Sequence, residues 1–357
     1  MRGELVGKAG SSMTALLHGR TPIGHDTSIV KRVYEHDAAY QQLAAAEAAY
    51  WSQPPPYSLE SLEGVFDDGP VEQYVNRRFT GDPKRGWWET LPQYGSFRRG
   101  LVLGTSSMTI EAGILRTNPD VHLTFVDISE GALARRREHF GAQFSGRFDT
   151  GRADLNFIEL PPAAYDLVVS SASLHHVTNL EYLADQIGRA LRPGGYFFMQ
   201  DYVGEQRFQF NEAKRRLFET FYLDYLRRLE PQRQTGLIWR DASDLSPFCG
   251  VRSNEVLPVL GDRLHPVSVR TANALLIPLG RAQTTDTPPP IRKTLPKLVR
   301  HFGYRFEDYQ RQLRGLRPRM RPLMPKSFFD EIFALDALLC DAGTLLPGIA
   351  FAVYTPR

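Results

Sequence analysis

The sequence predicts an α/β fold in which helices cover both faces of a mainly parallel sheet. Short apolar runs alternate with amphipathic stretches between residues 99 and 201, and each apolar run ends in small or polar residues. Strands separated by helices of ten or more residues usually form such a sheet. Ligands of this architecture bind beyond the carboxyl ends of the strands, so the functional residues are expected at those ends.

The elements follow one another regularly in this stretch. We expect strands at residues 101–103, 122–126, 166–170 and 196–199, with another before Asp154, and helices at residues 109–115, 132–139 and 179–191. An Ala-rich helix is expected earlier, over residues 28–51, because Thr27 or Ser28 can cap it and the prolines at 54–56 would end it. Residues 327–343 predict a late helix, and residues 348–356 a last strand.

The first three strands end in residues that suit a nucleoside. Gly104 permits a sharp turn, so that the amides of Thr105 and Ser106 open a helix and can face a polar ligand. Asp127 follows 23 residues later, where a carboxylate accepts hydrogen bonds from ribose hydroxyls. Asp154 follows the third strand and can accept from an adenine amino group.

Two apolar side chains, Ile128 and Leu155, can flank the adenine base in this interpretation. The structural alternative is that Asp127 caps the next helix and Asp154 lies in a turn.

The segment after the fourth strand carries the best proton acceptors. His175 and His176 are general-base candidates because an imidazole titrates near neutral pH. Ser170 and Ser171 can hydrogen-bond the polar tail of a ligand. The alternative for the two histidines is packing and helix capping.

Polar residues on several segments are expected to contact a substrate. They are Tyr74, Asp201, Tyr202, Arg207, Gln209 and Arg252. Arg77 and Arg78 can face an acidic group beside Tyr74, although a solvated helix face also explains them. Helical spacing of Phe218, Tyr222 and Tyr225 predicts a stripe that packs as core or forms a dimer interface.

Composition excludes several functional classes. The 357 residues include 43 basic and 40 acidic groups, a formal net charge of +3, which is not the signature of a dedicated nucleic-acid binder. The two cysteines, Cys249 and Cys340, are far apart in sequence, so we expect reduced thiols and no metal site. The chain has neither an apolar run long enough to span a membrane nor an N-terminal signal peptide, so a cytoplasmic protein is expected.

Several motifs together resemble the class I S-adenosylmethionine (SAM)-dependent methyltransferase family. They are LVLGTSSMTIE, FVDIS, ADLN, YDLVVSSASLHHV and LRPGG. DYVGEQRFQF, SPFCGVRS and LLPGIAFAVYTPR are similar to a bacterial small-molecule branch with DYVG-like and SPFEAVRS-like segments. The likeness covers roughly residues 71–357.

The resemblance implies a Rossmann-like sheet of seven strands whose last member is antiparallel. It implies SAM as cofactor, with S-adenosylhomocysteine as product, at Gly104, Asp127 and Asp154. We therefore expect an N-terminal arm and helical lid at 1–98 and a SAM-binding core at 99–203. An inserted helical cap should follow at 204–262, and residues 263–357 should complete the sheet with a basic helical segment.

The glycine loop departs from the family pattern. Val102 stands where the family has an acid, and Ser106 and Met108 replace the second and third glycines. A side chain at Ser106 narrows the approach to the methionine part of SAM. The nucleotide half of the site thus follows the family, while the methionine half is altered.

The leading functional hypothesis is SAM-dependent O- or N-methylation of a small molecule, in specialised metabolism. The alternatives are a cyclase or lyase that kept the fold and lost methyl transfer, and a non-catalytic partner subunit. A homodimer or a complex with a partner subunit fits either hypothesis.

Overall fold

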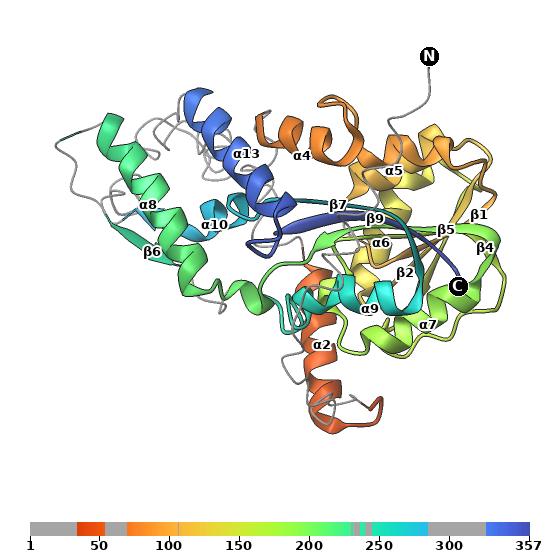
Figure 1. The fold of residues 1–357 in the computed structure, drawn as a ribbon. Helices are drawn as coiled ribbons and strands as arrows, with labels where there is room; N and C mark the ends of the chain where they lie inside the picture. Colours follow the sequence, from red (N-terminus) through yellow and green to blue (C-terminus); the bar gives the residue numbers. More distant parts are fainter. Residues whose placement is uncertain are drawn as a thin grey trace, which may run out of the picture.

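The computed structural model describes residues 34–53, 70–105, 107–229, 231, 236–239, 245–284 and 326–357. Its centre is one sheet of seven strands (Figure 1). In chain order these are β1 (Arg99–Leu103), β2 (His122–Asp127), β3 (Phe148–Arg152), β4 (Tyr165–Ser171), β5 (Leu191–Tyr202), β7 (His265–Ala272) and β9 (Ile349–Thr355). Their order across the sheet is β3-β2-β1-β4-β5-β9-β7, which confirms the predicted α/β class and the seven strands.

The chain reverses direction only at the far side of this sheet. Strands β1 to β5 pair in parallel, whereas β9 pairs antiparallel with both β5 and β7. The predicted antiparallel last strand is therefore confirmed. Because the parallel strands point the same way, the ends of β1, β2, β3, β4 and β5 meet at one edge, which we call the carboxyl edge.

Helices cover both faces of the sheet. One face packs against α4 (Pro70–Thr80), α5 (Met108–Thr117), α6 (Glu130–Gly141) and α13 (Lys326–Asp341). The other face packs against α7 (Leu180–Ala190) and α9 (Val256–Arg263), so α4 and α13 lie above the sheet in Figure 1 and α7 and α9 below it. In α7 the apolar residues Leu180, Leu183, Ala184 and Ile187 recur at helical spacing and are buried, which explains why this helix docks where it does.

Between β5 and α9, the described residues add the helix α8 (Glu212–Leu229) and one strand of a small second sheet. Helix α8 buries Phe218, Tyr222 and Tyr225 against Phe328 of α13. The aromatic stripe is therefore internal packing in this chain. Strand β6 (Leu237–Trp239) pairs with β8 (Ala282–Thr284), which follows the short helix α10 (Leu276–Arg281).

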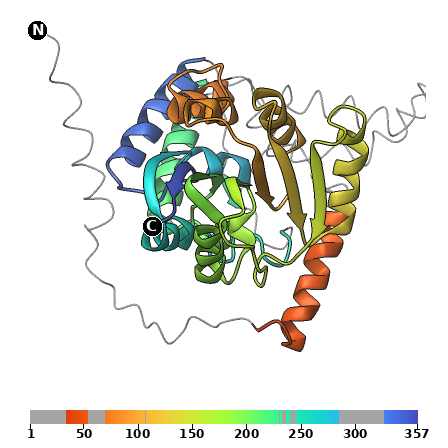
Figure 2. The ribbon, with the colours of Figure 1, turned by 90° about the vertical axis from the view of Figure 1, so that its right-hand side faces the viewer.

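Helix α2 (Ala38–Ser52) comes before the sheet and lies beside α6 (Figures 1 and 2). Residues 34–37 were expected to be helical and are not. The helix begins after Asp37, because the Asp37 carboxylate caps it by accepting from the amides of Ala39 and Tyr40. Thr27, Ser28 and the prolines at 54–56 lie outside the described residues.

Two further expectations need correction or fall outside the structure. Strand β5 begins at Leu191 rather than at Tyr196, so LRPGG belongs to the strand, with a register shift between Tyr165 and Leu167 of β4. The basic run from residue 292 to residue 325 lies outside the described residues. The proposed division into four parts stays a prediction.

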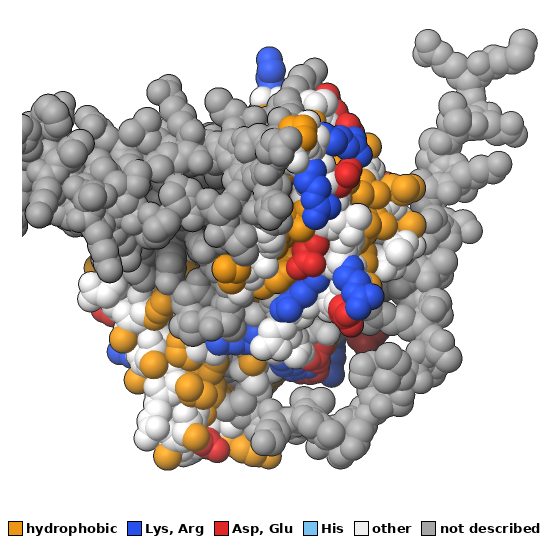
Figure 3. Space-filling model, turned by 90° about the vertical axis from the view of Figure 1, so that its left-hand side faces the viewer, with side chains coloured by type: hydrophobic (Ala, Val, Ile, Leu, Met, Phe, Trp, Pro, Cys, Tyr) orange, Lys and Arg blue, Asp and Glu red, His pale blue; other side chains and the backbone are white. Residues whose placement is uncertain are grey.

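The surface that can be seen in Figure 3 carries mixed charge. Basic and acidic side chains lie next to one another among hydrophobic ones on this face. Among the described residues, no helix is both long and apolar enough to cross a bilayer.

Candidate functional site

The turn after β1 is built around Gly104, whose φ is +73°. A Cβ added at Gly104 would lie 2.3 Å from Oγ of Ser173, so both the backbone angle and the neighbour demand glycine. Ser107 then caps α5 by accepting from the amide of Ile110. Ser106, one of the three residues that depart from the family pattern, lies outside the described residues.

Asp127 ends β2 directly beside this turn. One carboxylate oxygen accepts from the amide and the hydroxyl of Thr105, at 2.8 and 2.6 Å. The other accepts from the amide of Ser129 at 2.7 Å, while the Ser129 side chain caps α6. The alternative in which Asp127 caps that helix is thus wrong, because Ser129 does so. Asp127 instead holds the β1 and β2 turns together.

Asp154 follows β3 and is bonded by side chains of its own chain. It accepts from the hydroxyl of Tyr40 at 2.7 Å and from the backbone and side-chain nitrogens of Asn156. Ile128 packs against the cluster of Tyr40, Ala44 and Phe248, whereas Leu155 packs against the α7 side of the core. Helix α2 therefore brings Tyr40 to the position where an adenine was expected.

His175 is held by a buried carboxylate at the end of β5. It lies in a short 3-10 turn, η3 (Leu174–His176), which follows β4. Its Nδ1 is 2.5 Å from Oδ1 of Asp201, whose side chain is completely buried. The other Asp201 oxygen accepts from the amides of Ser173 and Leu174, at 2.9 and 2.7 Å. Asp201 thus orients the imidazole rather than facing outward.

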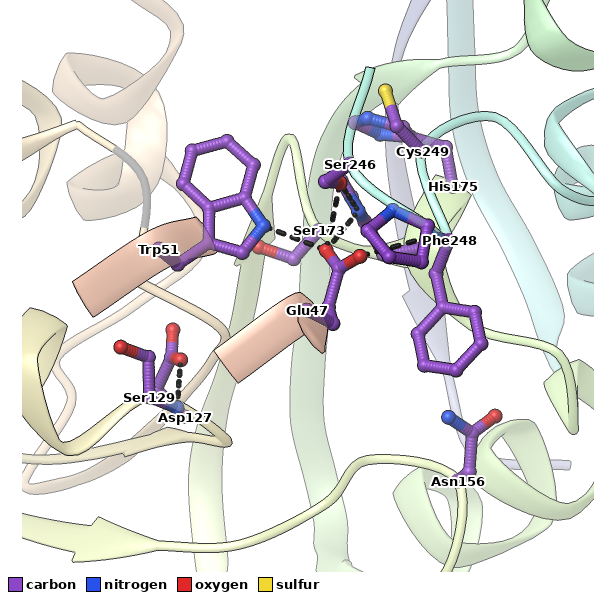
Figure 4. A network of polar contacts seen from close by, with 12 residues as sticks. Glu47, Trp51, Asp127, Ser129, Asn156, Ser173, His175, Ser246, Phe248 and Cys249 are labelled. Atoms are coloured by element: carbon purple, nitrogen blue, oxygen red, sulfur yellow. Dashed lines mark hydrogen bonds and ion pairs between the residues drawn. The ribbon is translucent and has the colours of Figure 1, made fainter. Parts of the chain in front are cut away.

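His176 is held by Glu47 of α2. Figure 4 labels Glu47 together with its partners Trp51, Ser246 and Phe248. Nδ1 of His176 lies 2.9 Å from Oε1 of Glu47, which also accepts from Nε1 of Trp51 and the hydroxyl of Ser246. The second oxygen, Oε2, accepts from the amide of Phe248 at 2.8 Å. One buried carboxylate therefore ties α2 to the turn after β4 and to the segment around residue 248.

The same segment places a cysteine against both histidines. One ligand atom each from His175, His176 and Cys249 lies within 4.8 Å of the other two, and the two imidazole centroids are 4.1 Å apart. The carbonyls of Ser246 and Cys249 both accept from Nη1 of Arg207, which fixes the turn that carries the thiol. We call His175, His176 and Cys249 the His-Cys cluster.

Charges in this cluster favour one another. Burial would raise the pKa of the Cys249 thiol, but the two imidazoles outweigh it and lower that pKa to about 6. Burial opposes charge on His176 too, yet Cys249 and Glu47 raise its pKa to about 10. The pKa of Glu47 falls to about 2 despite its burial, because His176 and the Phe248 amide bond it. At neutral pH the metal-free cluster is therefore an imidazolium beside a thiolate.

The remaining predicted ligand contacts have partners within the protein. Ser170 is buried and donates to the carbonyl of Leu103, and Ser171 donates to the Gln200 side chain. The Tyr202 hydroxyl donates to the carbonyl of Glu205. The assigned roles of these residues in binding stay predictions.

Arg252 and Gln209 differ in their surroundings. The Arg252 guanidinium bonds Glu181, Glu255 and the carbonyl of Thr178, which raises its pKa although burial opposes this. Gln209 is exposed. Arg252 therefore links the start of α7 to the turn before α9. Substrate contact by Arg252 or by Gln209 stays a prediction.

Tyr74 lies where α4 packs against α13, near the end of β7. Its hydroxyl donates to Asp336 at 2.7 Å and its ring stacks on Phe333, both from α13. Burial and the charge of Asp336 raise the pKa of Tyr74.

The two arginines of α4 differ in their surroundings. Arg78 bonds Asp341 and the carbonyl of Thr271, whereas Arg77 is exposed. Trp88 packs under Gly113 of α5, where an added Cβ would meet it at 2.4 Å.

Sequence reasoning missed three residues of this site, namely Tyr40, Glu47 and Cys249. A signal existed for two of them, because Tyr40, Ala44, Glu47 and Trp51 recur at helical spacing. A carboxylate in an otherwise apolar stripe requires a buried partner. No local pattern around Cys249 indicates the histidines, because they come more than 70 residues earlier.

Comparison with known proteins decides the family. Residues 101–197, which run from β1 into β5, match the model of the methyltransferase domain. Residues 101–197 therefore form a class I SAM-dependent methyltransferase domain. SAM is the cofactor of this family, and the matched domain contains Gly104, Asp127 and both histidines of the His-Cys cluster.

The methyltransferase domain is similar to two curated proteins. One is the ubiquinone/menaquinone biosynthesis C-methyltransferase UbiE of Methylobacterium nodulans, 28% identical over 28% of this chain and 39% of that protein. The other is the ribosomal RNA large subunit methyltransferase G of Streptomyces griseus, 31% identical over 36% of this chain and 34% of that one. The chain thus spans little more than a third of these relatives.

Among solved structures, phosphoethanolamine N-methyltransferase 2 of Haemonchus contortus in complex with SAM is similar at 14% identity and a TM-score of 0.42. The similarity covers 87% of this chain and 60% of that one.

Proposed function

We propose that this protein transfers a methyl group from SAM to an oxygen or nitrogen of a small molecule. The observation that carries the proposal is the placement of Asp127 beside the Gly104 turn. Asp154 follows the adjacent strand β3 at the same edge of the sheet. Carboxylates at these two places suit the ribose and the amino group of a nucleoside.

The carboxylate of Asp127 fits the ribose of SAM. Asp127 accepts three hydrogen bonds from Thr105 and Ser129. An ionised carboxylate offers about four acceptor sites, so a ribose hydroxyl still finds one. At the methionine end Val102 is buried and apolar, so this side chain offers nothing to an ammonium group.

SAM, when bound, supplies an electrophilic methyl carbon. The chain's part is to hold a substrate nucleophile in line with that carbon and to exclude water, because orientation supplies much of the rate. A hydroxyl or ammonium nucleophile also has to lose a proton. His175 and His176 are proposed to serve this step through Cys249, because the thiolate is the unprotonated member of the cluster at neutral pH.

The balance of charge supports a small molecule as substrate. The 43 basic and 40 acidic residues leave no large excess for a phosphate backbone, and both signs are mixed on the face in Figure 3. The relatives include proteins named for quinone biosynthesis and for ribosomal RNA. We propose the first kind of acceptor, a small organic molecule, for this chain.

One observation favours the alternative hypothesis of a methyltransferase fold that has lost methyl transfer. The hydroxyl of Tyr40 already bonds Asp154, and α2 packs against Ile128. While α2 stays in this place, Tyr40 competes with an adenine for Asp154, which would suit a protein that has become a cyclase, a lyase or a partner subunit.

Calorimetric titration of the full chain with SAM and with S-adenosylhomocysteine separates the two hypotheses. We expect SAM to bind, and to bind at least tenfold more weakly to Asp127→Asn. The amide NH2 group that replaces one carboxylate oxygen cannot accept a hydrogen bond, and it would face the donors that this oxygen now bonds. Asp120→Asn is the matched control, since Asp120 is an exposed carboxylate before β2. Absence of binding to the folded, ligand-free protein would exclude methyl transfer. Release of S-adenosylhomocysteine with phenol or amine acceptors, and not with RNA, would identify the acceptor class.

A further inference from the structure

The His-Cys cluster has the atoms of a metal site. Two imidazole nitrogens and one thiolate sulfur lie within 4.8 Å of one another. Ligand bonds to Zn²⁺ of about 2.0–2.3 Å in a tetrahedron place ligand atoms roughly 3.3–3.8 Å apart. The cluster therefore needs only a small contraction to hold an ion at its centre.

Both imidazoles are oriented as metal ligands are. Nδ1 of His175 faces Asp201 and Nδ1 of His176 faces Glu47, at 2.5 and 2.9 Å. A ring that donates from Nδ1 to a carboxylate presents the lone pair of Nε2 on its other side. Carboxylates that bond the far nitrogen of a ligating histidine are the common second layer of zinc sites, because they fix the tautomer and raise the basicity of the ring.

The two carboxylates are themselves held by backbone hydrogen bonds. Asp201 accepts from the backbone amides of Ser173 and Leu174, and Glu47 accepts from the amide of Phe248. Their side chains are almost completely buried. Such an arrangement holds the imidazoles in place before any ion arrives, so little conformational freedom is lost on binding.

The charge of the site also favours a cation. Two buried carboxylates and one thiolate surround two imidazoles that are neutral once they act as ligands. The net charge of these five groups is then −3, and a divalent ion reduces it. Such a site follows from the fold, because η3 brings the histidines, β5 brings Asp201, α2 brings Glu47 and the residue 246–249 segment brings Cys249. Figure 4 labels Glu47, His175 and Cys249 of this arrangement.

We propose that His175, His176 and Cys249 bind a divalent transition-metal ion, with Zn²⁺ as the best match. Two nitrogens and one sulfur are a borderline-soft ligand set, which disfavours Mg²⁺ and Ca²⁺. Three protein ligands leave the fourth tetrahedral position open, as in catalytic zinc sites, and an oxygen of a substrate can occupy it. An imidazole that ligates an ion cannot accept a proton, so the occupied site excludes the general-base role of these histidines.

The test is a metal titration of the full chain without a histidine tag. The protein is first treated with a chelator and a thiol reductant, then titrated with Zn²⁺ in competition with a chromophoric chelator. We expect one Zn²⁺ per chain with submicromolar affinity. Co²⁺ in the same place should give a thiolate-to-metal charge-transfer band and the intense visible bands of tetrahedral coordination.

Variants assign the site. Cys249→Ser should abolish the charge-transfer band and weaken Zn²⁺ binding about 100-fold or more. Cys340→Ala is the matched control, because it removes the other buried thiol, which lies by Asp336, and it should bind as the wild type does. Glu47→Gln should weaken binding about 10- to 100-fold while the Co²⁺ band remains, since it alters the second layer only.

The proposal fails if folded wild-type protein binds no stoichiometric Zn²⁺. It also fails if the Co²⁺ spectrum is the same in Cys249→Ser. Circular dichroism of each variant separates loss of the site from loss of the fold. Because no step of the test uses SAM, the result is independent of whether the protein transfers methyl groups.

Discussion

Oε1 of Glu47 lies 2.9 Å from Nδ1 of His176, and this contact joins a helix that precedes the sheet to the turn after β4. Four groups donate to Glu47, and they come from three segments of the chain. Trp51 lies in α2 itself, His176 in η3, and Ser246 and Phe248 in the segment before Cys249. Helix α2 is therefore attached to the carboxyl edge by one charged group as well as by packing.

Glu47→Ala should destabilise the protein by about 3 kcal/mol, because it leaves buried donors and an imidazolium without their acceptor. Chemical unfolding measures the change. Gln42→Ala, at an exposed position of the same helix, should cost less than about 0.5 kcal/mol. Limited proteolysis should cleave near α2 in Glu47→Ala first, and equal protection of both variants would contradict the fastening role.

Gly104→Ala should destabilise the protein more than Gly81→Ala does. Both glycines have positive φ, at +73° and +84°, so both variants carry the backbone cost of about 1 kcal/mol. Only at Gly104 does the new Cβ meet Ser173, at 2.3 Å, whereas nothing lies within 4 Å at Gly81. Thermal unfolding of the two variants compares the costs. Replacing Ser173 by glycine in the Gly104→Ala background should recover the difference.

Tyr40→Phe should strengthen SAM binding about 3- to 10-fold, which corresponds to one hydrogen bond of ordinary strength. The hydroxyl of Tyr40 bonds Asp154, so its removal returns an acceptor to the ligand. Calorimetry with SAM measures the change, and Tyr34→Phe, at an exposed tyrosine before α2, is the control. Unchanged or weaker binding in Tyr40→Phe would remove Asp154 from the cofactor site.

Glu181→Gln should lower stability at pH 7 by roughly 0.5–1 kcal/mol, because this partly exposed carboxylate bonds Arg252. Arg252 holds the pKa of Glu181 below its usual 4.5. A lowered folded-state pKa gives stability that is present above 4.5 and is lost as the pH falls through the folded value. The wild-type advantage should therefore shrink below pH 4.5. Asp185 forms an exposed pair with Arg263, so the stability of Asp185→Asn should differ little from that of the wild type, both at pH 7 and below pH 4.5.

Much of the fold could be predicted because the pattern of the sheet is local. Apolar runs such as 122–126 and 166–170 are long enough to be buried strands, and they ended within a residue or two of their predicted limits. The expected start at residue 28 is too early because Thr27 and Ser28 are good capping residues, whereas the Ala-rich stretch begins only at Ala38, after Asp37. The cap at Asp37 decided the boundary, and this depends on backbone geometry.

The site could be predicted only in part, because its residues meet through the fold. Gly104 and Asp127 belong to neighbouring strand ends, so the order of elements was enough to bring them together. Cys249 reaches His175 only after the chain has passed through β5, α8 and β6. Asp201 was expected to face a ligand, yet the amides of Ser173 and Leu174 occupy one of its oxygens.

The position of β9 between β5 and β7 has a consequence for synthesis of the protein. Residues 349–355 are made after residues 273–348, so β5 and β7 have to wait for a partner that arrives last. Until then each presents an unpaired edge, which invites pairing with other chains. A nascent chain that stalls before β9 is therefore the species most exposed to aggregation and most dependent on chaperones.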